Sequence, residues 1–361
     1  MFYWLFHQCL GINLFRYVTF RLCLSAMTGF LVAVLLGPRV IRFLRKRSIG
    51  ENTDKAPTQE VRNILGTKKG TPTMGGVLIL LGILAGTLLW ARLTAPSLLL
   101  AVFVTVSLAA VGFVDDCVKL FSATRNGVRG RTKLAAQTGI ALIAAALLFR
   151  VMAGVEHGTD LAFPVFKDLY VPLGLLFLAT TTIVVVGSSN AVNLTDGLDG
   201  LAAGTVAMAG FGFIALSYVT GHKVIAEYLL IPHIPGAEEL SVFCASLVGA
   251  TLGFLWFNCY PAEIFMGDTG ALSLGGALGF VSVAIKQEFA LFIVGGIFVA
   301  EALSVMAQVA SFKLTGKRVL LMSPLHLHFR TAGMNEVKVV VRFCIVGGML
   351  AIVSLLLLKI R

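Results

Sequence analysis

Long apolar runs alternate with short polar connections along almost the whole chain. A helix needs about 20 consecutive apolar residues to cross a bilayer, where it satisfies its own backbone hydrogen bonds. The pattern therefore predicts an all-α polytopic membrane protein with about ten transmembrane helices. No internal repeat or low-complexity tract is visible, so we expect a single domain over residues 1–361. The candidate spans are residues 20–41, 75–92, 97–114, 134–153, 170–188, 200–219, 239–257, 270–286, 288–311 and 340–358.

Composition and charge support a membrane protein and exclude most soluble classes. Of the 361 residues, 57% are hydrophobic and 13% are charged, whereas soluble domains are about 25% charged. The net charge of +11 does not indicate a nucleic-acid partner, because the connections 39–73, 115–133 and 312–342 hold 20 of the 29 Lys and Arg residues. By the positive-inside rule these connections face the cytoplasm and both termini lie outside, so their polar motifs should face the cytoplasm too.

The stretch from Asn190 to Gly200, Asn-Ala-Val-Asn-Leu-Thr-Asp-Gly-Leu-Asp-Gly, is unusually polar for a connection between two spans. Asp196 and Asp199 are three residues apart, so both carboxylates share one face if the segment is helical. Polar groups at a membrane edge are costly and usually functional. The alternative is a capped turn between two helices, because Asp, Asn and Gly are ordinary turn residues.

Two adjacent carboxylates, Asp115 and Asp116, directly follow the span 97–114. Adjacent helical residues point about 100° apart, so we expect different roles for them, and Asp116 can pair with Lys119. Paired carboxylates suit Mg²⁺, which takes one or two carboxylates and completes its shell with water and phosphate oxygens. The same connection ends in further cationic residues, including Lys133. The alternative is a salt-bridged helix end.

Three further motifs lie in connections that should be cytoplasmic. Lys68 precedes a glycine-rich entry to a helix, which suits either a phosphate site or a positive-inside anchor. Asp268 lies on a turn where it can reach a metal or cap a helix. Phe265 beside it suits stacking on a flat ring or a place in the lipid-facing aromatic belt. His326 and His328 are two residues apart, which favours phosphate contact over a zinc helix or a plain surface loop.

Together these acids, lysines and histidines describe a Mg²⁺-dependent site for phosphoryl transfer on a diphosphate. Its place at the membrane edge suggests that one reactant is a lipid. The alternative from another class is a secondary transporter that uses intramembrane acids for proton coupling. The acids of a transporter should lie mid-span, and Glu301 is the main acid that does so. We expect Glu301 to be structural and to face the bundle interior.

Five motifs occur in one order, namely Thr71-Pro-Thr-Met-Gly-Gly, Phe113-Val-Asp-Asp, the Asn190–Gly200 stretch, Phe265-Met-Gly-Asp and Pro324-Leu-His-Leu-His-Phe. With them the chain resembles the phospho-N-acetylmuramoyl-pentapeptide-transferase family, within the polyprenyl-phosphate N-acetylhexosamine-1-phosphate transferases. The resemblance implies ten transmembrane helices with periplasmic termini, a bacterial inner-membrane location and a homodimer. It implies Mg²⁺-dependent transfer from UDP-MurNAc-pentapeptide to undecaprenyl phosphate, giving lipid I and UMP. A sister enzyme that moves GlcNAc-1-phosphate is the alternative, and the first of the five motifs argues against it.

Matched residue by residue, the resemblance implies that Asp115 and Asp116 are a catalytic pair. It also implies that Asp268 is catalytic and binds Mg²⁺, with Asp115 or Asp116 as a second ligand. The sequence departs from the family pattern at Leu327, where the family has the middle histidine of a triplet, and at Arg330, where an acidic residue is common. The implied substrate-binding residues are Lys68, Lys119, Lys133, Asn190, Asn193, Asp196, Asp199, Phe265, His326 and His328.

Overall fold

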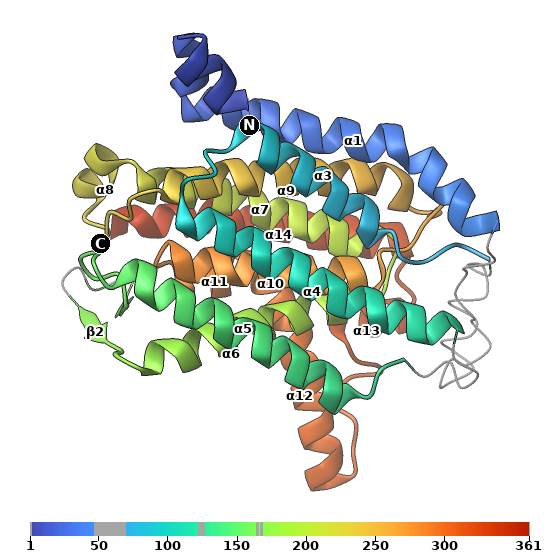
Figure 1. Ribbon diagram of the computed structural model, residues 1–361. Helices are drawn as coiled ribbons and strands as arrows, with labels where there is room; N and C mark the ends of the chain where they lie inside the picture. Colours follow the sequence, from blue (N-terminus) through green and yellow to red (C-terminus); the bar gives the residue numbers. More distant parts are fainter. Residues whose placement is uncertain (1, 47–69, 122–126, 164–165, 167–168, 361) are drawn as a thin grey trace.

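A computed structural model describes residues 2–46, 70–121, 127–163, 166 and 169–360 as a bundle of helices (Figure 1). The first half of the chain holds η1 (Tyr3–Cys9), η2 (Asn13–Arg16), α1 (Val18–Lys46), α3 (Gly76–Trp90), α4 (Pro96–Phe121), α5 (Gly130–Met152), β1 (Asp160–Ala162), β2 (Tyr170–Pro172) and α6 (Leu176–Thr195). The second half holds α7 (Leu201–Gly221), α8 (Lys223–Leu229), α9 (Ala237–Asn258), α10 (Gly267–Ala284), α11 (Glu288–Val294), α12 (Gly296–Thr315), α13 (Leu325–Thr331) and α14 (Glu336–Ile360).

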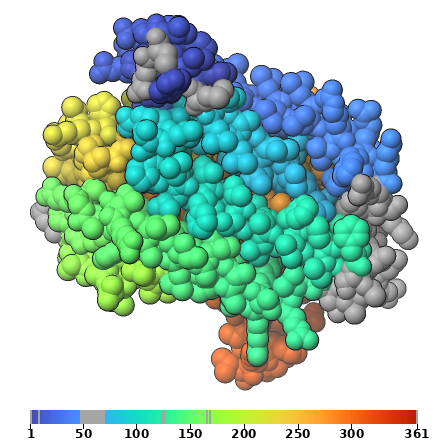
Figure 2. Space-filling model, viewed as in Figure 1, coloured from blue at the N-terminus to red at the C-terminus, as the bar shows by residue number. Residues whose placement is uncertain are grey.

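Eight of the described helices are long and apolar enough to cross a membrane, namely α1, α4, α5, α6, α7, α9, α12 and α14. The other two expected spans correspond to α3, which has only 15 residues, and to α10. The multi-pass membrane class predicted from hydropathy is confirmed, while the count of ten and the side of each terminus stay predictions. In the space-filling view, α1, α3, α4 and α5 cover one face of the bundle (Figure 2).

A short β-hairpin departs from the purely helical expectation. Strands β1 and β2 pair antiparallel, with Leu161 opposite Val171. The hairpin takes residues that hydropathy assigned to a span over 170–188, and α6 begins only at Leu176. Two residues explain the late start, because Pro172 lacks an amide hydrogen and Gly174 adopts a positive φ of 51°.

The expected span over 288–311 is not one helix. It is divided into α11 and α12 at Gly295 and Gly296, two residues of low helix propensity. Figure 1 shows that α12 then runs away from the rest of the bundle, and its end protrudes in Figure 2. After α12 the chain returns as a separate helix, α13, which contacts both α12 and α14.

Helix α10 occupies the centre of the molecule, where it packs against α4 and α6. All of its residues from Thr269 to Ala284 are buried. Two glycines allow neighbouring helices to reach its first turn. A Cβ atom on Gly112 of α4 would lie 2.3 Å from the carbonyl oxygen of Asp268, and one on Gly76 of α3 would lie 2.1 Å from the nitrogen of Gly270. The fold thus places Asp268 where three helices meet.

Candidate active site

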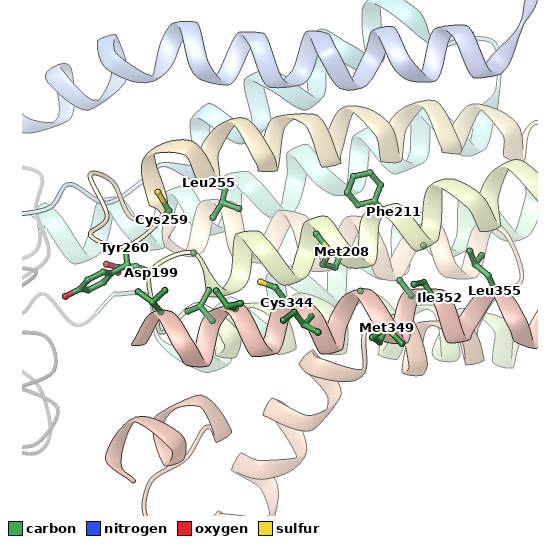
Figure 3. A pocket seen from close by; sticks show the side chains of 18 residues that line it. Asp199, Met208, Phe211, Leu255, Cys259, Tyr260, Cys344, Met349, Ile352 and Leu355 are labelled. Carbon is green, nitrogen blue, oxygen red and sulfur yellow. The ribbon is translucent and has the colours of Figure 1, made fainter. Parts of the chain in front are cut away.

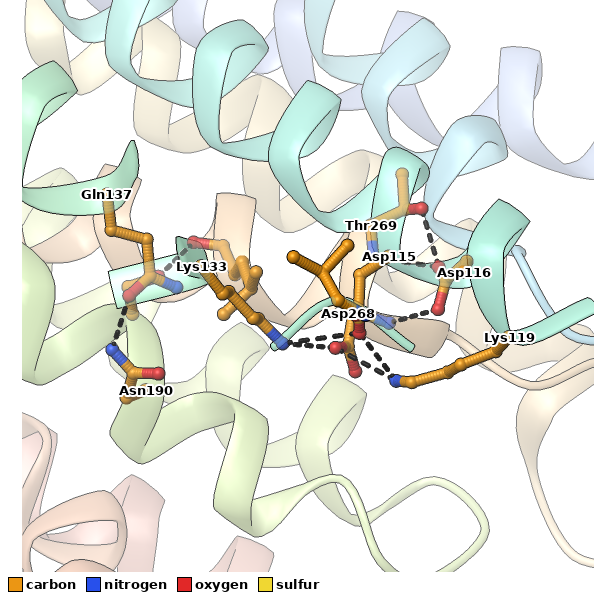
Figure 4. Close-up of polar contacts among 11 residues, drawn as sticks. Asp115, Asp116, Lys119, Lys133, Gln137, Asn190, Asp268 and Thr269 are labelled. Carbon is orange, nitrogen blue, oxygen red and sulfur yellow. Dashed lines mark hydrogen bonds and ion pairs between the residues drawn. The ribbon is translucent and has the colours of Figure 1, made fainter. Parts of the chain in front are cut away.

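Two carboxylates and two ammonium groups form one cluster where α4 ends and α5 and α10 begin (Figure 4). The Nζ atom of Lys119 lies 2.7 Å from Asp115 Oδ2 and 3.0 Å from Asp268 Oδ2. The Nζ atom of Lys133 lies 3.5 Å from Asp115 Oδ2 and also donates a hydrogen bond to Asp268 Oδ2. The second oxygen of Asp115, Oδ1, accepts a hydrogen bond of 2.7 Å from the Val128 amide. We call these four charged residues the Asp115–Asp268 cluster.

The two carboxylates of the cluster are placed so that they could share one divalent cation. Asp115 Oδ2 and Asp268 Oδ2 face one position, because both lie within ion-pair distance of the same two ammonium groups. Among the described residues, no group of three or more His, Cys, Asp and Glu side chains could hold a metal. Two carboxylates fit Mg²⁺, because this ion keeps most of its shell for water and phosphate oxygens.

Asp116 has a different task from its neighbour. Its carboxylate accepts hydrogen bonds from the amides of Asp268 (3.1 Å) and Thr269 (3.0 Å) and from the Thr269 hydroxyl (2.7 Å). Asp116 is only 3% exposed. Its carboxylate therefore satisfies, inside the protein, N–H groups of the first turn of α10 that have no partner within the helix. The expected pairing of Asp116 with Lys119 is wrong, because Asp116 points to α10 and Lys119 pairs with Asp115 one helical turn away.

Asn190 joins α6 to α5 beside the cluster (Figure 4). Its Nδ2 atom donates to Gln137 Oε1 and to the Val186 carbonyl, both at 2.8 Å. Gln137 follows Lys133 by one helical turn, is fully buried, and its Nε2 atom has no hydrogen-bond partner among the described residues. Sequence reasoning missed Gln137, a lone amide inside the apolar run 134–153.

The polar stretch after α6 forms a turn and not a helical face. A shared face for its two carboxylates was expected only if the segment were helical, and α6 ends at Thr195, so the alternative of a turn between two helices holds. Asp199 is buried and its Oδ2 atom accepts a hydrogen bond of 3.1 Å from the Ala262 amide. Gly200 has a φ of +79° and donates from its amide to Asn258 Oδ1 at 3.1 Å. Asn258, another residue that sequence reasoning missed, thus helps to tie this turn to the loop before α10.

Phe265 lies in the loop between α9 and α10, beside the glycine-rich segment that precedes α3. Its amide donates to the Pro72 carbonyl and its carbonyl accepts from the Gly75 amide, each at 2.8 Å. The Gly76 amide donates to the Met266 carbonyl at the same distance. The segment before α3 and the segment before Asp268, which are far apart in the sequence, are therefore joined by backbone hydrogen bonds.

The two histidines of α13 have different surroundings. His326 is buried, its amide donates to Glu301 Oε1 (3.1 Å), and its Nδ1 atom lies 3.1 Å from Glu301 Oε2 without the alignment of a hydrogen bond. Its Nε2 atom lies against the turn after α6, since a Cβ atom on Gly197 would be 2.2 Å away. His328 Nδ1 accepts from the Leu321 amide at 3.2 Å. The interior position predicted for Glu301 is confirmed, because its side chain is fully buried.

The structure brings only part of the predicted site into direct contact. The four members of the Asp115–Asp268 cluster touch one another, and Asp116 holds the backbone of Asp268. Asn193 and Asp196 are half-buried at the end of α6. Lys68 lies outside the described residues. The catalytic, metal-binding and substrate-binding roles expected for all of the predicted site residues stay predictions.

The chain was compared with known proteins. A model of glycosyl transferase family 4 matches residues 98–286, from α4 to just after α10. Signature 1 of phospho-N-acetylmuramoyl-pentapeptide-transferase matches residues 68–80. A phospho-N-acetylmuramoyl-pentapeptide-transferase from Maricaulis maris (strain MCS10) is 49% identical over 353 residues, which are 97% of this chain and 96% of that protein. The chain therefore belongs to glycosyl transferase family 4 and, within it, to the phospho-N-acetylmuramoyl-pentapeptide-transferases.

Proposed function

We propose that this protein transfers phospho-MurNAc-pentapeptide from UDP-MurNAc-pentapeptide to undecaprenyl phosphate, which forms lipid I and releases UMP. The observation that carries the proposal is the 49% identity to the Maricaulis maris transferase over 97% of the chain. The signature at residues 68–80 supports the muramoyl-pentapeptide substrate over UDP-GlcNAc. The reaction is the first membrane step of peptidoglycan synthesis.

Asp268 and Asp115 are the residues that would hold Mg²⁺, which when bound neutralises the diphosphate and the charge that develops during transfer. Lys119 and Lys133 lie beside both carboxylates, and their ammonium groups are suited to bind phosphate oxygens. Asp116 keeps the backbone of Asp268 in place through the start of α10. With the cation bound, both oxygens of Asp115 would be occupied, so its part is to hold the cation and not to accept a proton.

The acceptor phosphate attacks the β-phosphate of the nucleotide sugar, and UMP is the leaving group. A phosphate monoester is already largely ionised near neutral pH, with a second pKa of about 6, so the need for a strong base is modest. We therefore favour direct attack over a phospho-aspartyl intermediate. Trapping of a phosphorylated aspartate in enzyme given only the nucleotide sugar would contradict direct attack.

The polyprenyl chain of the acceptor fits an apolar groove of about 820 Å³ beside α7 and α14 (Figure 3). The lining begins at Asp199 and Gly200 of the polar turn and extends along α14 from Val337 to Leu355. At about 1.5 Å per residue this part of α14 is roughly 27 Å long, close to the hydrocarbon thickness of about 30 Å. A phospholipid tail occupies only one leaflet, so the length of the groove favours a longer polyprenyl chain.

We further propose that the enzyme is a homodimer in the bacterial inner membrane, with its active site on the cytoplasmic face. The concentration of Lys and Arg in the connections around the site supports this orientation. Exposed apolar side chains on α1 and α14 that lie outside the groove, such as Leu35 and Leu356, suit contact with lipid or with a second copy of the chain. The dimer rests on the family resemblance alone.

An assay of product formation tests the substrate assignment. Purified protein receives undecaprenyl phosphate, Mg²⁺ and either UDP-MurNAc-pentapeptide or UDP-GlcNAc, and release of UMP is measured together with the lipid product. We expect UMP and lipid I with the muramoyl-pentapeptide donor. Activity with UDP-GlcNAc alone would instead assign the chain to the sister reaction.

A further inference from the structure

The two lysines of the Asp115–Asp268 cluster contact the same pair of oxygen atoms. Asp115 Oδ2 and Asp268 Oδ2 each lie within 3.5 Å of both ammonium nitrogens. A divalent cation held by both carboxylates would need these same oxygens, because Asp115 Oδ1 is occupied by the Val128 amide. The lysines and the cation therefore compete for one position.

The competition between the lysines and the cation should be strong in the resting cluster and weak when a diphosphate is present. In the resting cluster, two carboxylates and two ammonium groups balance. A dication placed beside both ammonium groups would be repelled by them, and at distances of a few ångströms such repulsion is large in a partly buried site. When a diphosphate is also present, the ammonium groups can bind its oxygens and leave the carboxylates to the cation.

We propose that Lys119 and Lys133 are exchangeable counter-ions, which neutralise Asp115 and Asp268 at rest and turn to the diphosphate when the cation binds. The inference rests on the proposed function, because it takes the nucleotide diphosphate as the ligand of the released lysines. Solvent exposure differs between them, since the side chain of Lys119 is 43% exposed and that of Lys133 is 13% exposed. The pair thus makes cation binding and nucleotide binding favour each other, and linkage requires this coupling to be reciprocal.

Titration of the resting protein with Mg²⁺, in the absence of any nucleotide, tests the competition directly. Lys133→Met and Lys119→Met each remove one competing charge and keep an unbranched side chain of similar length. We expect each variant to bind Mg²⁺ about tenfold more tightly than the unmodified protein, a coupling of the size usual between linked sites. Arg131→Met is the matched control, because Arg131 is an exposed cation two residues from Lys133 and contacts no carboxylate among the described residues.

A second titration adds UDP-MurNAc-pentapeptide without the lipid acceptor. We expect the nucleotide sugar to tighten Mg²⁺ binding in the unmodified protein and to tighten it much less in Lys133→Met. Equal thermal stability of the variants shows that folding is intact, and Lys119→Met serves if Lys133→Met does not fold.

The proposal is overturned if neither lysine variant binds Mg²⁺ more tightly than the unmodified protein. It is also overturned if Arg131→Met tightens binding as much, because the effect would then be that of general surface charge. The nucleotide-free titration does not depend on which sugar is transferred. An enzyme that makes no lipid I but shows the shift in Mg²⁺ affinity would therefore sink the proposed function and leave the exchange intact.

Discussion

At the scale of single residues, two neighbouring carboxylates carry out different tasks. Asp115 faces the lysines and its second oxygen binds the Val128 amide, whereas the hydrogen bonds of Asp116 within the described residues all go to groups at the start of α10. The helical angle between adjacent residues is sufficient to predict that the two differ. It is not sufficient to predict which one pairs with Lys119, because that depends on where α10 lies.

Asp116→Asn tests the positioning role of this carboxylate. The amide nitrogen of the new side chain would face donors, so we expect the free energy of unfolding to fall by about 1–3 kcal/mol. Thr269→Val, which removes one of the three hydrogen bonds, should cost about 1 kcal/mol. Denaturation of the purified proteins in detergent measures both. An Asp116→Asn protein of full stability but without turnover would show a direct catalytic role instead.

Glu301 supports a second prediction at this scale. Its carboxylate binds the backbone amide of His326, and a glutamine at this position can still accept that hydrogen bond. We expect Glu301→Gln to fold, to bind the nucleotide sugar and to retain turnover. Glu301→Ala leaves the buried amide unpaired and should lose about 1–3 kcal/mol of stability. Loss of turnover in Glu301→Gln with folding and binding intact would contradict the structural role.

At the scale of elements, the close packing around α10 positions the site. Hydropathy predicts that spans exist here, but it does not say which helices touch, because that depends on glycines whose partners lie far away in the sequence. The division of α11 from α12 and the hairpin before α6 were missed for a related reason. Each is local backbone behaviour at Gly or Pro inside a stretch that is apolar overall.

Gly76→Ala probes the contact between α3 and α10. The added methyl group would lie 2.1 Å from the Gly270 nitrogen, so the helices must move apart and Asp268 must shift with them. We expect a lower thermal midpoint and a loss of turnover of at least about tenfold, which corresponds to about 1.4 kcal/mol. Gly139→Ala on α5 is the control, because its methyl group meets nothing within 4 Å and alanine favours a helix. Equal effects of both substitutions would exclude the contact as the cause.

At the scale of the whole molecule, the apolar pattern predicts the membrane class and nearly every long helix. Charge and polar clustering also predict the members of the Asp115–Asp268 cluster, because carboxylates and lysines at a membrane edge are rare. Gln137 and Asn258 were missed because each is a single amide within or beside an apolar run. Their importance comes from partners elsewhere in the fold, Asn190 on α6 and Gly200 in the turn before α7, which no local pattern identifies.

The groove beside α14 gives a prediction about where the lipid acceptor binds. Gly348→Phe places a ring among the lining residues, whereas Val346→Phe places the same ring on an exposed position of α14 outside the lining. We expect the first substitution to raise KM for undecaprenyl phosphate several-fold and to leave nucleotide binding unchanged. The second should change neither. Kinetics at varied lipid concentration measure the difference, and equal KM values for both variants would exclude the groove as the site of the polyprenyl chain.

The most direct measurement of the central claim is the Mg²⁺ dependence of UMP release by Asp268→Asn beside the unmodified enzyme. The carboxylate of Asp268 pairs with both lysines, and Asp116 holds its backbone in place. We therefore expect the site to depend on the charge of this carboxylate. We predict that Asp268→Asn stays folded, still binds the nucleotide sugar, and shows no Mg²⁺-dependent release of UMP at any Mg²⁺ concentration. Release of UMP at the rate and with the Mg²⁺ dependence of the unmodified enzyme would contradict the assignment of the active site.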